Sequence, residues 1–308
     1  MELKQKYDVV IIGGGIGGIM CAYRLIEKEP NLDILLLERG KGLRNRECPI
    51  VTGKVDHCIK CVPCSIMEGM GGAGAFSDGK YIISTEYGGW LPEILGNKEA
   101  IKYIEQADSI MMKYGAQKEC FTPSDELKRE CMKHDLYMQQ AKVKHLGTDA
   151  NFATMVKLVD YLSHKIQIET LSTVTDVNKV TKEIFIENKN KNYTTTADKI
   201  VFAVGRAGSR SFRKWCDNNE VKCKNNQVDI GVRVELPSIV WEHFSKKIYE
   251  PKILYRSEKY GDTTRMFCFN ERGHVVTENT DGVLTVNGHS YKDEPKNRQT
   301  QILHYYQQ

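Results

Sequence analysis

The hydrophobic and polar positions of the first forty residues predict a strand, a helix and a second strand. Residues 7–12 form a near-continuous apolar run that ends at glycine, as a buried parallel strand does. Residues 19–28 have the spacing of an amphipathic helix, which must end before Pro30. Residues 33–38 form a second apolar run that closes on Glu38. The pattern predicts a β-α-β unit at the start of the chain.

The rest of the chain alternates between helical and strand patterns. Helical periodicity is found in residues 98–114, 124–143 (with Ser124 as N-cap) and 152–164. Strands are predicted at residues 166–169, 173–180, 183–187, 197–208 and 228–237. A hairpin tip is predicted at residues 188–192, and a strand followed by a tight turn at residues 282–291.

The turn between the first strand and the first helix carries a chemical motif. Residues 13–18 fit G-x-G-x-x-G, in which Gly13 permits the turn, Gly15 admits a pyrophosphate and Gly18 allows close helix packing. The helix N-terminus attracts phosphates. Glu38 lies 20 residues beyond Gly18, where a carboxylate can accept from a ribose hydroxyl and disfavours a 2′-phosphate. We therefore predict a dinucleotide-binding α/β fold of the Rossmann type.

Composition narrows the class of protein. A chain of 308 residues has room for two domains, and 41% hydrophobic with 27% charged residues is typical of a folded globule. The net charge of +4 is dispersed, so nucleic acid is not the expected partner. No apolar run reaches the roughly 18 residues of a membrane span. The N-terminus has no signal-peptide pattern, so we expect a cytoplasmic protein with reduced thiols.

Four cysteines lie close together in the sequence. Cys58, Cys61 and Cys64 have C-x-x-C-x-x-C spacing, and Cys48 can supply a fourth thiolate. Four thiolates suit an iron–sulfur cluster or zinc, whereas C-x-x-C thiols also suit a redox disulfide. A loop of inert thiols is the third interpretation, because the ending of a bacterial ferredoxin motif is absent. The sequence leaves these three alternatives open.

The segment that follows, residues 69–79, is rich in glycine. Such a loop lets backbone amides approach a phosphate or a flat ring closely. Met70, Phe76 and the Ser-Asp-Gly turn distinguish it from a flexible linker. We expect this loop to bind a ligand.

The sequence resembles a bacterial family of largely uncharacterised FAD-dependent dehydrogenases, which is distantly similar to glutathione-reductase-type flavoproteins. The resemblance is carried by residues 8–15, residues 37–40, Cys48-Pro and above all residues 71–80, Gly-Gly-Ala-Gly-Ala-Phe-Ser-Asp-Gly-Lys. It implies FAD rather than NAD at the first glycine turn, with the 71–80 loop along the flavin. It also implies a Rossmann-like FAD-binding domain with an inserted α+β substrate domain.

The motif and the resemblance together define the expected cofactor-binding residues. The resemblance implies that the backbone of Val174 contacts adenine, and that an Ala-x-Gly-Arg return strand ends in Gly205 and Arg206. Arg206 suits a phosphate or an anionic substrate. The expected set is Gly13, Gly14, Gly15, Ile16, Gly17, Gly18, Glu38, Arg39, Gly71, Gly72, Gly74, Ser77, Asp78, Val174, Gly205 and Arg206.

The substrate side offers weaker candidates. Arg233, Arg265 and His289 are the residues we select there, because arginine suits a carboxylate and histidine suits proton transfer. His145 precedes a predicted helix and is interpreted as a structural or surface histidine. No second G-x-G-x-x-G follows a strand, so the sequence does not specify the electron donor or acceptor.

The resemblance ends near Lys296. The family would continue with a run like Thr-Asn-Phe-Ala-Leu-Leu, and a shifted reading frame of residues 298–308 allows that run. We therefore expect a frameshift near Asn297 or Arg298 and a C-terminally truncated product that lacks the family's return segment. Such a product would expose a sheet edge and hold FAD weakly.

The expected protein is an FAD-dependent oxidoreductase that passes a hydride or electrons between the flavin and a small organic substrate. The expected organisation is residues 1–95 and 165–210 as the FAD-binding domain, residues 96–164 as a helical insertion and residues 211–308 as a β-rich substrate side. Two alternatives stay open. One is a truncated, catalytically inactive product, and the other is a thiol–disulfide or iron–sulfur electron-transfer protein centred on the cysteines.

Overall fold

The computed structural model of the chain describes residues 2–87, 89–225, 230–270, 274–280, 283–289 and 300–307. The chain forms two compact units, each built from separate stretches of sequence. Unit 1 comprises Met1–Lys80, Ala107–Gln117 and Leu146–Lys224, and unit 2 comprises Tyr81–Gln106, Lys118–His145 and Asn225–Gln308.

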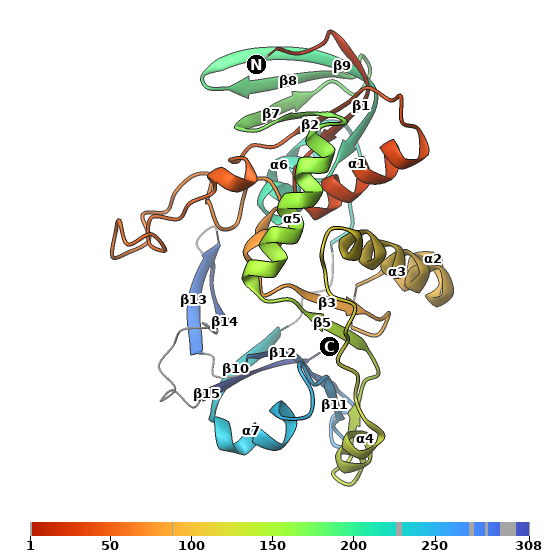
Figure 1. Cartoon of the computed structure of the whole chain (residues 1–308), viewed down its shortest axis with the longest axis vertical. Helices are drawn as coiled ribbons and strands as arrows, with labels where there is room; N and C mark the ends of the chain where they lie inside the picture. Colours follow the sequence, from red (N-terminus) through yellow and green to blue (C-terminus); the bar gives the residue numbers. More distant parts are fainter. Residues whose placement is uncertain are drawn as a thin grey trace. The chain divides into compact units, whose positions relative to one another are not determined.

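Unit 1 is built on a six-stranded sheet with the order β6-β2-β1-β9-β8-β7. Figure 1 shows β7, β8 and β9 of this sheet next to one another. Its strands are β1 (Lys6–Ile12), β2 (Ile34–Leu37), β6 (Gln167–Glu169), β7 (Ser172–Val177), β8 (Glu183–Asn188) and β9 (Lys191–Phe202). The pairs β6-β2, β2-β1 and β1-β9 are parallel, and β9-β8 and β8-β7 are antiparallel. This mixed sheet confirms the predicted Rossmann-like α/β fold.

Strands β1 and β2 of this sheet are buried on both faces, which explains their continuous apolar runs. Val10, Ile11, Leu35 and Leu36 of β1 and β2 are fully buried, as expected for parallel strands covered by helices. Helix α1 (Ile16–Lys28) buries an amphipathic stripe that consists of Ile19, Ala22, Tyr23 and Ile26. The predicted β-α-β unit is therefore confirmed.

Helix α6 (Gly205–Asn218) packs against a second apolar cluster of unit 1. Trp215 lies beside Phe202, with ring centroids 4.8 Å apart, and its indole N–H donates to the carbonyl of Val177 at 2.7 Å. The prediction of a strand over residues 197–208 is therefore wrong beyond Phe202. The strand ends there, and Gly205 begins a helix whose Trp215 fills the space above β7.

The antiparallel end of the sheet follows the sequence prediction closely. Strands β8 and β9 are joined by a turn in which Lys189 and Asn190 have φ of +49° and +61°. Two consecutive positive φ values match the right-handed twist of a tight hairpin. The hairpin tip predicted at residues 188–192 is confirmed.

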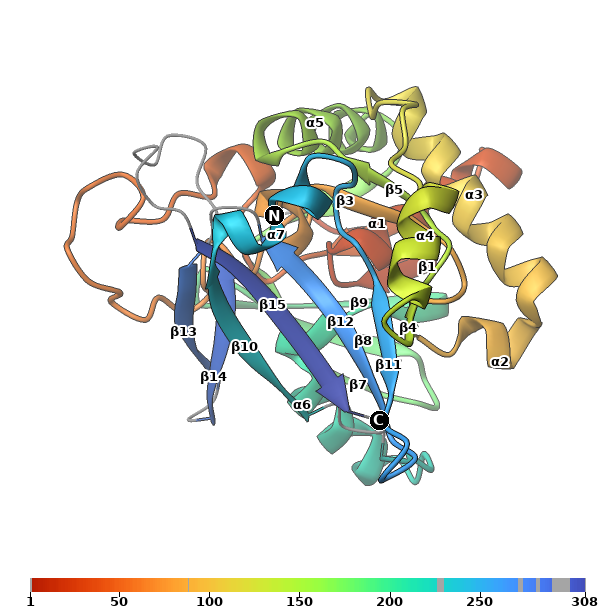
Figure 2. The ribbon, with the colours of Figure 1, turned by 90° about the horizontal axis from the view of Figure 1, so that it is seen from below.

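Unit 2 contains a five-stranded antiparallel sheet with the order β10-β15-β12-β11-β4, and Figure 2 shows β10, β15, β12 and β11 side by side. Its strands are β4 (Leu136–Met138), β10 (Ile230–Pro237), β11 (Ile253–Arg256), β12 (Thr263–Asn270) and β15 (Thr300–Gln307). Its core joins Leu127 and Cys131 of α4 (Asp125–Met132) and Phe244 of α7 (Ser238–Ser245) to Met266 and Phe269 of β12.

The other elements of the described residues are two strand pairs, three α-helices and the short 3-10 helices η1 (Leu43–Asn45) and η2 (Ala73–Phe76). The two-stranded sheets are β13 (His274–Thr280) with β14 (Val283–His289), and β3 (Lys80–Ile83) with β5 (Lys142–His145). The helices are α2 (Leu91–Leu95), α3 (Asn97–Lys113) and α5 (Thr148–Ser163), and α3 and α5 confirm the predicted helices. No helix in the described part of the chain has both the length and the apolar character needed to cross a bilayer.

The helix predicted over residues 124–143 is wrong in its second half. Ser124 is the N-cap, and its hydroxyl accepts from the Leu127 amide at 3.2 Å, as predicted. The helix ends at Met132, and Asp135 then takes a φ of +55° that reverses the chain. Residues 136–138 pair with β11, so strand pairing distant in sequence overrides the local periodicity.

The predictions for the C-terminal part are tested only in part. Strand β14 extends through His289, which pairs with His274, so residues 287–289 do not form the tight turn predicted there. Val228, Gly282, Ser290 and Tyr291 lie outside the described residues, as do Asn297 and Arg298, where the frameshift is predicted.

The fully buried side chain of Leu36 tests the contribution of the parallel sheet to stability. We expect Leu36→Ala to lower the free energy of unfolding by about 2–5 kcal/mol, because the cavity adds to the lost transfer energy. Urea unfolding of the full chain measures this change. Val180→Ala is the control, since that side chain is 87% exposed and its truncation should cost less than about 0.5 kcal/mol. Equal losses in the two variants would contradict the arrangement.

Candidate functional site

The first glycine turn connects β1 to α1 in a conformation that requires glycine. Gly13 has a φ of +112°, and a Cβ atom there would lie 2.3 Å from the Ala203 carbonyl oxygen at the end of β9. A Cβ atom added to Gly15 or Gly17 would have no neighbouring atom within 4 Å. The turn is therefore tightly packed on its sheet side, whereas backbone at the start of α1 is open to approach. The free amides of a helix N-terminus at such a place suit a phosphate.

Glu38 follows β2 directly and lies beside this turn. Its side chain is 7% exposed. One carboxylate oxygen accepts from the Gly14 amide at 2.7 Å, and the other accepts from the Gly40 amide at 2.7 Å. An ionised carboxylate offers about four acceptor positions, so capacity remains for a ribose hydroxyl. These features fit an anionic dinucleotide.

The second glycine loop lies against the first glycine turn. The Gly71 amide donates to the Gly14 carbonyl at 2.8 Å, and the Met70 amide donates to the Lys41 carbonyl at 2.9 Å. Gly72 has a φ of +62°, and a Cβ atom there would lie 3.2 Å from the Gly15 Cα. The structure thus joins two motifs that are separated by more than fifty residues in the sequence.

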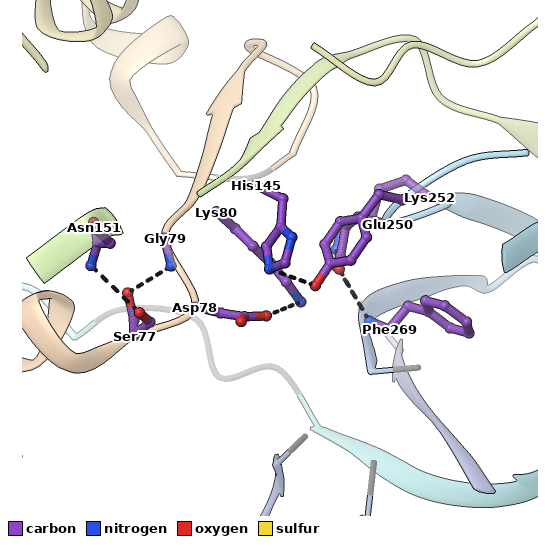
Figure 3. Close-up of polar contacts among 10 residues, drawn as sticks. Ser77, Asp78, Gly79, Lys80, His145, Asn151, Glu250, Lys252 and Phe269 are labelled. Carbon is purple, nitrogen blue, oxygen red and sulfur yellow. Dashed lines mark hydrogen bonds and ion pairs between the residues drawn. The ribbon is translucent and has the colours of Figure 1, made fainter. Parts of the chain in front are cut away.

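Helix α5 holds the far end of this loop. The Asn151 side-chain amide, 2% exposed, donates to the Gly74 carbonyl at 2.8 Å. It also donates to the Ser77 carbonyl at 3.4 Å (Figure 3). The Ser77 hydroxyl in turn accepts from the Gly79 amide at 3.3 Å. The carboxylate of Asp78 lies 3.7 Å from the Lys80 ammonium. Asn151 is not among the predicted site residues, and it lies directly before the helix predicted at residues 152–164.

Arg46 is the second residue that the sequence analysis missed. Its guanidinium is buried and donates to four backbone carbonyls between residues 65 and 72. A single arginine before Cys48 has no spacing signal, so only the folded loop identifies it.

Four further predicted cofactor residues lie in β7, in α6 and in the segment after β2. Arg39 pairs with Glu68 at 2.6 Å, and its guanidinium also donates to the carbonyl of Ala207 in α6 at 3.4 Å. Gly205 has a φ of +60° at the start of α6, and Arg206 is exposed beside it. Val174 lies in β7 opposite Ile186. The roles of these residues stay predictions.

The four cysteines belong to a long loop between Arg46 and Ser65. Cys58 is exposed, Cys48, Cys61 and Cys64 are half-buried, and all four are free thiols. Within the described residues, no group of three or more histidine, cysteine, aspartate or glutamate side chains is arranged to hold a metal ion. The structure does not bring the four thiols together as a preformed metal site.

Unit 2 contains a buried ion pair. The Lys252 ammonium lies 3.2 Å from a Glu250 carboxylate oxygen, and the side chains are 4% and 2% exposed (Figure 3). The Glu250 carboxylate also accepts from the Phe269 amide at 3.3 Å, and Glu250 itself has a φ of +64°. The ammonium lies 5.3 Å from the centre of the Tyr87 ring. Burial, and then the charge of Glu250, raises the pKa of the Tyr87 hydroxyl.

A second polar contact in unit 2 involves Tyr249, the residue that precedes Glu250. The Tyr249 hydroxyl lies 2.9 Å from Nε2 of His145, and the two rings are stacked with centroids 3.9 Å apart. His145 is half-buried. The contact fixes the orientation of the imidazole, as a structural histidine requires.

The three substrate-side candidates lie on three different strands of unit 2. Arg233 lies in β10, where its Nε donates to the Val286 carbonyl at 3.2 Å. Arg265 lies in β12, two strands away from β10 in the sheet. The backbone of His289 is in β14, but its side chain lies outside the described residues. Their catalytic roles stay predictions.

The parallel β-α-β unit, the two apposed glycine loops and the buried acid after β2 define a dinucleotide-binding α/β protein. The chain belongs to the pyridine nucleotide-disulphide oxidoreductase family, whose model matches residues 7–225. This membership confirms the predicted relationship to flavin-dependent oxidoreductases, a family that implies a flavin as cofactor.

Individual relatives are distant. An uncharacterised protein of Clostridium beijerinckii is 24% identical over 301 residues, which cover 94% of this chain and 49% of that protein. The chain thus spans about half the length of that relative. A flavoprotein/dehydrogenase structure from Cytophaga hutchinsonii has a TM-score of 0.43 and 12% identity, covering 98% of this chain and 56% of that one. Glycine oxidase from Geobacillus kaustophilus has a TM-score of 0.42 and 13% identity, covering 75% and 62%.

The buried ion pair of unit 2 gives a test of its role in stability. We expect Lys252→Met to lower the free energy of unfolding by about 3–5 kcal/mol, because the buried Glu250 charge loses its ammonium partner. Lys247→Met is the matched control. It breaks the exposed pair with Glu126, which should contribute less than about 1 kcal/mol. Urea unfolding of both variants measures the two losses. A loss below about 1 kcal/mol for Lys252→Met would contradict a buried, charged pair.

Proposed function

We propose that this protein catalyses flavin-dependent redox chemistry on a small organic substrate, with FAD bound to unit 1. The observation that carries the proposal is the Glu38 carboxylate, buried between the Gly14 and Gly40 amides beside the open start of α1. When bound, FAD supplies the carrier of the hydride or electrons.

The residues of unit 1 would divide the work of holding FAD. Backbone near Gly15 and Gly17 and the N-terminus of α1 would take the pyrophosphate, since both positions are open. Glu38 would accept from the adenosine ribose. The loop from Gly71 to Asp78 would lie along the flavin, with the Val174 backbone at adenine and Arg206 at a phosphate or an anionic substrate.

Unit 2 would supply the substrate side. Arg233 and Arg265 suit a substrate carboxylate, and His289 suits transfer of a proton. The Tyr249 contact supports a positional role for His145 rather than a free acid or base.

We propose separately that the cysteine loop has thiol or metal chemistry. The spacing of Cys48, Cys58, Cys61 and Cys64 supports it. Metal analysis of the purified protein and a thiol titration distinguish the alternatives. Titration of all ten cysteines as free thiols, together with less than stoichiometric iron and zinc, would contradict bound metal.

The absorption spectrum of the purified full chain, before and after addition of FAD, tests the main proposal. We expect flavin bands that stay with the protein on gel filtration. Protein that stays folded and binds no FAD would contradict the proposal.

The Glu38→Ala variant tests the residue that carries the proposal. We expect it to weaken FAD binding at least about tenfold, because a hydrogen bond to a charged group contributes about 1.5–3 kcal/mol. Fluorescence titration with FAD measures the dissociation constant. Glu187→Ala, at an exposed position of β8, is the control and should bind FAD like the wild-type protein.

A further inference from the structure

We infer that Arg46 is a positioning residue for the flavin, because one buried guanidinium holds the second glycine loop in its binding conformation. The inference rests on the FAD site proposed above and adds the residue that shapes it. Arg46 belongs to neither glycine motif, and its hydrogen bonds to the loop all go to backbone carbonyls.

The guanidinium of Arg46 uses all three of its nitrogen atoms. Its side chain is 6% exposed and lies over the Phe76 ring, with Cζ 4.6 Å from the ring centre. The bonds are Nε to Ser65 O at 2.9 Å, Nη1 to Met70 O at 2.8 Å and Gly72 O at 2.7 Å, and Nη2 to Ile66 O at 2.6 Å. The planar, five-donor guanidinium suits such a set, whereas a lysine ammonium on its flexible stem does not.

The charge of Arg46 is retained in this buried place. Burial lowers its pKa to about 10, while the nearby Glu38, Cys64 and Glu68 favour the charged form. The guanidinium is therefore a cation at neutral pH. Its positive charge offsets the partial negative charges of the four carbonyl oxygens that accept its hydrogen bonds. The Met70 and Gly72 carbonyls would otherwise stand uncompensated next to the site of an anionic pyrophosphate.

The loop that Arg46 holds has an unusually free backbone. Gly69, Gly71 and Gly72 have φ values of +116°, +87° and +62°, a region that glycine enters readily and other residues rarely. A segment of this kind loses much conformational entropy when it is ordered. Arg46 limits that loss before the ligand arrives, and a Cβ atom on Gly69 would lie only 2.8 Å from the Arg46 Cδ. Preorganisation of this kind appears as ligand affinity.

The test compares the full-length wild-type protein with Arg46→Lys and Arg46→Gln. We expect both variants to bind FAD at least about tenfold more weakly, with Arg46→Lys failing to restore wild-type affinity. Arg44→Gln is the control. Arg44 lies two residues before Arg46, and its exposed guanidinium pairs with Asp160. Its removal should leave FAD affinity unchanged. If both Arg46 variants bind FAD as tightly as the wild-type protein, the role of Arg46 is overturned, whereas the proposed FAD site is not.

Hydrogen exchange of the wild-type protein without FAD gives a second measurement that needs no variant. We expect the Met70 and Gly71 amides to be protected already, because the loop is held before ligand binding. Full exchange of residues 65–76 that becomes protected only on adding FAD would overturn the inference. Protection without any FAD binding would instead contradict the flavin site, and with it the role of Arg46 toward the flavin.

Discussion

The arrangement of the site depends on the carboxylate of Glu38. Its two carboxylate oxygens accept from the Gly14 and Gly40 amides. Its main chain extends the pairing of β2 with β6, because its amide donates to the Glu169 carbonyl at 2.9 Å. A buried charge is costly unless it is hydrogen-bonded, and the two amides at 2.7 Å meet that requirement. The turn after β1 and the turn after β2 are thereby tied at a fixed distance. The second glycine loop then docks on Gly14, whose position this carboxylate sets.

The parts of this architecture that sequence predicts are those encoded within a few consecutive residues. The β1–α1–β2 unit follows from apolar runs, a glycine turn and Pro30, and the turn at Lys189 and Asn190 follows from local hairpin geometry. Arg46 and Asn151 escaped prediction because each acts on backbone carbonyls of a loop that has no pattern of its own. The helix expected to run to residue 143 failed for a related reason, since residues 136–138 pair with residues 253–255.

Helix α3 makes the two units interdependent along the chain. Its first part, through Gln106, belongs to unit 2, and its last part, from Ala107, belongs to unit 1. In unit 1 the Lys113 ammonium donates to the Tyr23 hydroxyl at 3.0 Å and lies within 6 Å of the centres of three tyrosine rings, those of Tyr23, Tyr114 and Tyr161. The continuous helix means that neither unit can be excised at a simple linker without dividing a regular element.

The loop of residues 47–64 lies within unit 1 and has its two ends side by side, where the Arg46 guanidinium donates to the Ser65 carbonyl. Its two ends are therefore joined independently of what lies between them. Once the ends of a loop are fixed, doubling its length costs only about 0.6 kcal/mol in closure entropy. A change in the length of this segment should therefore cost little in stability, while the hydrogen bonds of Arg46 keep the second glycine loop in place.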